Sequence, residues 1–77
     1  MRFADNNYNI YKSVTKKDLV VELYKTSFAR VYAKDADDWC NQCAARIFEQ
    51  HGHRLEFNDA DTFVNELIKY KLIMEIN

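Results

Sequence analysis

The sequence predicts an α+β fold in which a small antiparallel sheet, built from N-terminal strands, packs against two helices. Two observations lead to this prediction. Segments rich in aromatic and β-branched residues come first, and two segments with apolar residues at helical spacing follow, at about 36–51 and 59–71. Because the chain has 77 residues, of which 48% are apolar, we expect one core and a single domain over residues 1–77.

Three segments near the N-terminus are expected to be strands because they combine aromatic and β-branched residues. A helix is the alternative for the second and third of them. Thr15 and Asp18 form a capping pattern, and one helix from Asp18 to Ala33 fits the apolar spacing, which would make the fold a three-helix bundle. We predict strands because valine, threonine, tyrosine and phenylalanine are weak helix formers. The three segments are 8–14 (YNIYKSV), 19–24 (LVVELY) and 28–33 (FARVYA).

The two helices are predicted from stripes of apolar residues separated by polar ones. Asp35, Asp37 and Asp38 suit the start of the first helix, and Gly52 suits its end. The second helix is expected to begin near Asn58 or Asp59. Short strands are expected at 53–57 (HRLEF) and 72–76 (LIMEI). The first stripe consists of Ala36, Cys40, Cys43, Ala44 and Ile47, and the second of Ala60, Phe63, Val64, Leu67 and Ile68.

Glycine and proline are scarce, with a single glycine at Gly52 and no proline. This composition excludes the P-loop and the dinucleotide-binding fingerprint, because both need several glycines to let the backbone approach phosphate. We therefore expect no nucleotide or other cofactor. The sequence has no long apolar run and no signal-peptide pattern at its start, so we also expect no membrane span and a cytoplasmic location.

Charge is unevenly distributed along the chain. Residues 1–34 contain seven basic and three acidic residues, for a net charge of +4, whereas residues 35–77 contain four and nine, for −5. The total of −1 disfavours a dedicated nucleic-acid binder, which usually carries a clear positive excess. The two halves are expected either to attract each other in the fold or to present faces of opposite sign.

One recognisable chemical motif is the dithiol Trp39-Cys40-Asn41-Gln42-Cys43. A helix N-terminus would stabilise a thiolate at Cys40, and Cys43 is close enough to resolve a mixed disulfide. Residues 28–57 resemble the first β-α-β unit of thioredoxin and glutaredoxin. The resemblance implies a dithiol oxidoreductase with Cys40 as the nucleophile, although the chain lacks the proline that this family places opposite the dithiol.

Two other interpretations apply to the same cysteines. Cys40 and Cys43 lie on the apolar stripe of the first helix, where free cysteine commonly serves as a small buried hydrophobe, and this is the interpretation we favour. A metal site is the third alternative, because zinc would accept both thiolates together with the imidazoles of His51 and His53.

A partner-binding surface is predicted on one face of the strands. With strand alternation, Val20, Glu22 and Tyr24 share a face, as do Phe28, Arg30 and Tyr32, and Tyr11 can join them. The opposite faces carry small and aliphatic residues that suit packing under the helices, namely Leu19, Val21 and Leu23 in one segment and Ala29, Val31 and Ala33 in the other. Two helices cannot cover both faces of the sheet, and exposed tyrosine and arginine are typical of protein interfaces. The residues predicted to bind the partner are Tyr11, Tyr24, Arg30 and Tyr32.

We therefore predict a non-enzymatic protein-binding module. It would act as a regulator or inhibitor by occupying a partner's surface, as do many small proteins that phages and mobile elements direct against host enzymes or defence systems. The same surface could instead close a homodimer. Aromatic and basic residues on a sheet are also found in readers of single-stranded RNA, but no motif of such readers is present.

Overall fold

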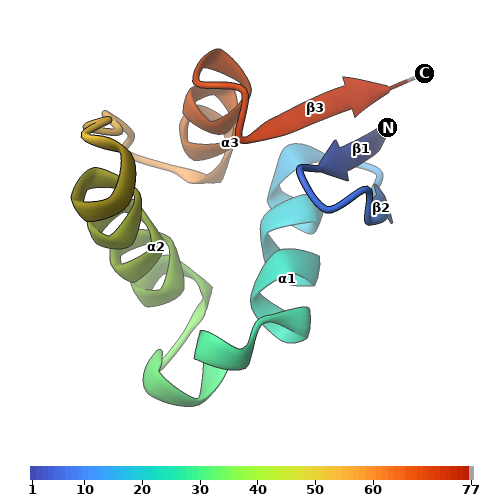
Figure 1. The fold of residues 1–77 in the computed structure, drawn as a ribbon. Helices are drawn as coiled ribbons and strands as arrows, with labels where there is room; N and C mark the ends of the chain where they lie inside the picture. The colour runs from blue at the N-terminus through green and yellow to red at the C-terminus, as the bar shows by residue number, and fades with distance from the viewer. Residues whose placement is uncertain (77) are drawn as a thin grey trace.

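Two short strands, three helices and a last strand follow one another along the chain, with a 3-10 turn between the first two helices (Figure 1). The computed structural model describes residues 1–76, apart from the side chain of Ala29. This order confirms the predicted α+β class. The elements are β1 (Arg2–Asp5), β2 (Ile10–Lys12), α1 (Lys16–Thr26), η1 (Phe28–Tyr32), α2 (Ala36–His51), α3 (Ala60–Lys69) and β3 (Ile73–Ile76).

The sheet is antiparallel, with strand order β2-β1-β3 and β1 in the centre. Phe3 on β1 is completely buried, and it pairs with Tyr11 on β2 and with Glu75 on β3. Strand β2 lies inside the predicted segment 8–14, and β3 lies inside 72–76. Strand β1 was not predicted, because its sequence RFAD contains neither a β-branched residue nor a clear alternation.

The strands predicted at 19–24 and 28–33 are wrong. Residues 16–26 form α1, and residues 28–32 form η1. Helix α1 begins with the cap that the sequence indicated, because the Thr15 hydroxyl accepts a hydrogen bond of 3.1 Å from the backbone N–H of Asp18. Leu19 and Val20 are both buried, which a strand cannot achieve against a single core because neighbouring side chains point to opposite faces. Tertiary burial therefore overrides the β propensity of this segment.

Helices α2 and α3 were predicted from their apolar stripes and are present. The Asp35 side chain caps α2 by accepting a bond of 2.8 Å from the backbone N–H of Asp38. Asp59 caps α3 in the same way and forms a reciprocal capping box with Thr62. Gly52 ends α2 in the left-handed conformation, with φ of 73°, as expected for a helix C-terminus.

The strand predicted at 53–57 is also wrong, because this segment is irregular and pairs with no strand of the sheet. It crosses from α2 to α3 and contributes apolar side chains to the core, and one of its backbone N–H groups, that of Glu56, donates to the Glu66 side chain at 2.9 Å. Leu55 is buried, and the Phe57 ring packs edge-on against Phe63 at a centroid distance of 4.9 Å.

The core lies between the inner face of the sheet and helices α1 and α3, with α2 packed against α1 on the far side from the sheet (Figure 1). Its completely buried large side chains are Phe3, Leu19, Phe63 and Val64. Trp39 from α2 joins them through an edge-on contact with Phe63 at 6.1 Å. This arrangement leaves η1 at the far end of α1, away from the sheet.

Candidate functional site

The 3-10 turn η1 presents large apolar side chains to solvent. Phe28 is 94% exposed, Val31 71% and Tyr32 81%, and Arg30 is exposed between them. We call these four residues the aromatic turn. Hydrophobic burial stabilises folding by about 1.5–3 kcal/mol for a side chain of this size, and the fold forgoes this gain at three positions within five residues. Exposed apolar residues that are clustered in this way indicate an interaction surface.

The backbone of the aromatic turn is well anchored although its side chains are free. Within the turn, the backbone N–H groups of Arg30 and Ala33 donate to the carbonyls of Ser27 and Arg30, both at 3.3 Å. Helix α2 holds the end of the turn, because Gln42 Nε2 donates to the Tyr32 carbonyl at 2.9 Å. A surface that is already ordered loses less conformational entropy on binding, so this anchoring favours recognition.

Basic residues surround the aromatic turn. The stretch 24–34 contains three basic residues and no acidic one. Lys25, Arg30 and Lys34 are all exposed. The Arg30 guanidinium donates to the Ser27 carbonyl at 3.2 Å, which keeps its charge beside the turn without neutralising it. The site therefore combines an apolar centre with nearby basic side chains, and the acidic residues Asp35, Asp37 and Asp38 follow directly at the start of α2.

The structure brings together two of the four predicted partner-binding residues, Arg30 and Tyr32. Tyr24 lies half-buried on α1 and packs against the core. Tyr11 lies on β2, and its hydroxyl donates to the Asp5 carboxylate at 3.0 Å. Partial burial, together with this negatively charged acceptor, raises the pKa of Tyr11 above its ordinary value. The four residues therefore do not share one surface.

Two residues of the aromatic turn were absent from the partner-binding residues predicted from sequence. Phe28 was expected on the same strand face as Arg30 and Tyr32 but was not included, and Val31 was expected on the buried face of that strand. The assignment of Val31 is wrong because strand alternation does not apply in a 3-10 turn, where the side chains at 28, 31 and 32 all reach solvent. Exposure of this segment could have been inferred from its length, because residues 28–32 include three large apolar side chains and are too few to bury them all.

The sheet has an open outer face, but different residues form it. Ala4 pairs with Ile10 on one side and Met74 on the other, and this row points away from buried Phe3. Ile10 and Met74 are exposed. One face of the sheet is therefore exposed, as expected, but β1, β2 and β3 form it, and the segments 19–24 and 28–33 do not.

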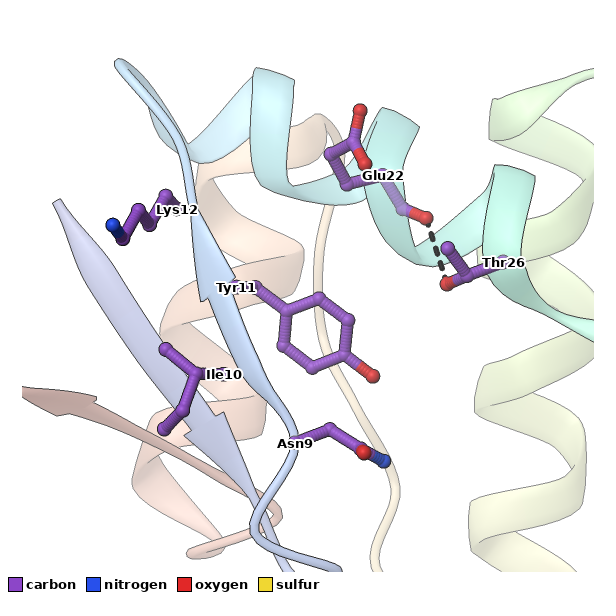
Figure 2. Close-up of a pocket in the computed structure, with 6 residues that line it drawn as sticks. All are labelled: Asn9, Ile10, Tyr11, Lys12, Glu22 and Thr26. Atoms are coloured by element: carbon purple, nitrogen blue, oxygen red, sulfur yellow. Dashed lines mark hydrogen bonds between the residues drawn. The ribbon is translucent and has the colours of Figure 1, made fainter.

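An open groove runs between β2 and α1 (Figure 2). Its volume is about 460 Å³. The Tyr11 ring projects into the space between the two elements, and Glu22 and Thr26 stand on the helix side. The groove contains the carboxylate of Glu22, which takes part in no ion pair within the described residues, whereas the Lys12 side chain lies on the opposite side of β2 from Tyr11 and points away from α1 (Figure 2). The lining residues are Asn9, Ile10, Tyr11, Lys12, Glu22 and Thr26.

Both cysteines lie inside α2 with free thiols. Because Asp35 is the cap, Cys40 is the fifth residue of the helix and not its first. Burial, with smaller contributions from Cys43 and Asp37, raises the pKa of Cys40 to about 12. Burial also raises the pKa of Cys43, against an opposing effect of Arg46. At neutral pH both thiols stay protonated, which disfavours the nucleophile that a dithiol oxidoreductase needs. The strands expected before and after α2 in a thioredoxin-like unit are absent from 28–33 and 53–57.

The two histidines form part of a ring stack at the end of α2. The His51 and His53 rings are 6.2 Å apart with nearly parallel planes, and His53 stacks on Tyr70 at 4.4 Å. Within residues 1–76, no three histidine, cysteine or acidic side chains come together in a group that could hold a metal ion. The set Cys40, Cys43, His51 and His53 is therefore not assembled.

Comparisons with known protein families, curated proteins and solved structures find no match to this chain. None of the described helices is both long and apolar enough to cross a membrane.

Proposed function

We propose that this protein binds another protein through the aromatic turn, and that it regulates or inhibits this partner by occupying its surface. One observation carries the proposal. Phe28, Val31 and Tyr32 remain exposed on a turn whose backbone is held by Ser27 and Gln42. Aromatic residues with a nearby arginine supply much of the binding energy in protein interfaces.

The chemistry of the site specifies the kind of partner surface. An apolar pocket would bury the Phe28 and Tyr32 rings, and acidic residues around that pocket would complement Lys25, Arg30 and Lys34. Charge complementarity would mainly accelerate association, and burial of the rings would supply most of the affinity.

A non-enzymatic role is consistent with the environment of the chemically reactive groups. Cys40 and Cys43 are the candidate nucleophiles of the sequence. Burial raises the pKa of both thiols, so they stay protonated at neutral pH. Free cysteines also suit a reducing compartment, so we place the protein in the cytoplasm. Regulators of this kind are common among the small proteins of phages and mobile elements.

Affinity capture from the source organism tests the proposal. The wild-type protein and the double variant Phe28→Ala/Tyr32→Ala are immobilised separately, and the proteins retained on each are compared. We expect a partner that binds the wild type and is lost from the double variant. Met74→Ala is the matched control, because Met74 is also exposed but lies on β3, and it should retain the partner. Equal retention by the double variant would show that the aromatic turn is not the binding site.

A further inference from the structure

Strand β2 has a free edge with a definite set of backbone groups. At the open end of the β1–β2 hairpin, Met1 and Ser13 exchange two backbone bonds, of 3.0 and 2.8 Å. In an antiparallel ladder such bonded pairs alternate with non-bonded ones. Phe3 and Tyr11 therefore form the next bonded pair, and the backbone groups of Ile10 and Lys12 point away from β1.

The outward backbone groups of Ile10 and Lys12 comprise two N–H donors and two C=O acceptors. No hydrogen bond from these four groups to another described residue is present. Strand β2 is an edge of the sheet, so no other strand within residues 1–76 covers them. A row of unpaired donors and acceptors at this spacing is a template for one additional strand.

Helix α1 provides a second wall beside this edge. The groove of about 460 Å³ separates β2 from α1 and is open to solvent (Figure 2). The Tyr11 ring offers an apolar contact within the groove, and the Glu22 carboxylate carries a negative charge on the helix wall. An extended peptide between an edge strand and a helix can form backbone bonds to the strand while its alternate side chains contact the helix.

We propose that the groove between β2 and α1 binds an extended peptide segment of the partner protein, which adds to β2 as a fourth strand. The segment carries a lysine or arginine on the side that faces Glu22, because that carboxylate has no basic partner among the described residues. This inference rests on the proposed function, since it assigns a second contact to the same partner. Thr26 lines the groove and lies two residues before Phe28, so a partner chain can reach both sites.

The probe is a phage-displayed library of random ten-residue peptides, selected on the full-length protein. Synthetic copies of the selected peptides are then added to ¹⁵N-labelled protein, and amide exchange is measured by NMR. We expect the amides of Ile10 and Lys12, which are free in the unbound protein, to exchange at least tenfold more slowly. N-methylation of the peptide at the residues that pair with β2 should weaken binding at least tenfold, because it removes backbone donors.

Two substitutions at one position separate the backbone from the side chain. Lys12→Pro removes an outward N–H and should abolish peptide binding, and the fold should tolerate it because proline is accepted on edge strands. Lys12→Ala keeps the N–H and should bind the selected peptides as the wild type does. Circular dichroism checks that both variants are folded. If Lys12→Pro does not fold, the N-methylated peptides still decide the question.

Three results would overturn the inference. One is that selection enriches no peptide that protects Ile10 and Lys12. Another is that the N-methylated peptides bind as tightly as the parent peptides. The third is protection of both amides by protein concentration alone, which would show that a second copy of this chain occupies the edge. If the inference fails while Phe28→Ala/Tyr32→Ala still loses its partner, the proposed function stands without the strand contact.

Discussion

Two phenylalanines show how differently the molecule treats its apolar residues. Phe63 on α3 is completely buried and packs edge-on against Trp39 and Phe57, whereas Phe28 on the aromatic turn is 94% exposed. The same type of side chain therefore stabilises the fold in one region and lies almost entirely in solvent in the other. Because the turn is nevertheless ordered by backbone bonds, its side chains are available for another molecule.

The largest loss of stability is expected in the core, at Phe63. Phe63→Ala removes a completely buried ring and leaves a cavity beside Trp39, so it should destabilise the protein by about 3–5 kcal/mol. In a domain of this size that loss removes most or all of the stability. Urea unfolding followed by Trp39 fluorescence measures it. A loss below about 1 kcal/mol would show that α3 is not part of the core.

Thiol labelling compares the reactivity of the cysteines inside α2 with that of a cysteine on the aromatic turn. With a pKa of about 12 instead of the ordinary 9.0, Cys40 should carry about 1,000-fold less thiolate at pH 8 than a free thiol. We expect native Cys40 and Cys43 to react slowly with iodoacetamide and quickly after denaturation, as followed by mass spectrometry. Val31→Cys places a thiol on the aromatic turn and should react at the rate of a free cysteine. Rapid labelling of native Cys40 would instead revive the oxidoreductase interpretation.

A smaller change in stability is expected at the β1–β2 turn, where the Asp5 carboxylate accepts several hydrogen bonds. Partial burial by itself would raise the pKa of Asp5. Bonds from the Asn9 side chain and backbone, from Tyr11 and from the Asn7 backbone lower it more, so the pKa lies below 3.8. A lowered pKa means that the carboxylate stabilises the fold above its unfolded pKa, and that this contribution disappears as the pH falls through the folded value.

Asp5→Asn should therefore destabilise the protein by about 1 kcal/mol at pH 7 and by much less at pH 2. Thermal unfolding of both proteins over this range provides the measurement. A difference that stays constant with pH would mean that the charge of Asp5 does not contribute to stability.

The helical part of the fold could be predicted from sequence because its signals are local. The apolar stripes from Ala36 to Ile47 and from Ala60 to Ile68 mark α2 and α3 without knowledge of the rest of the chain, whereas the exact capping residues, Asp35 and Asp59, come from the structure. Helix α1 was expected only as the alternative to two strands, although its cap at Thr15 was visible, and the alternative ran too far, to Ala33 instead of Thr26. Its residues have β propensity, and the joint burial of Leu19 and Val20 in the core cluster that also contains Phe3 and Phe63 favours the helix.

The candidate site was only partly predictable because it depends on exposure, which a sequence pattern does not encode. Arg30 and Tyr32 were predicted because arginine and tyrosine are common in protein interfaces. That reason holds whether the segment is a strand or a 3-10 turn. Tyr24 has the same type but packs against the core. Val31 was assigned to the wrong side because period-two alternation was applied to a 3-10 turn.

The unfolding free energy of the triple variant Phe28→Ala/Val31→Ala/Tyr32→Ala shows whether the aromatic turn is a free surface or part of the core. We expect a value within about 1 kcal/mol of the wild type, because these side chains are largely exposed and do not belong to the core. A loss of about 3 kcal/mol or more would show that the turn belongs to the core, and the proposed binding surface would then be wrong.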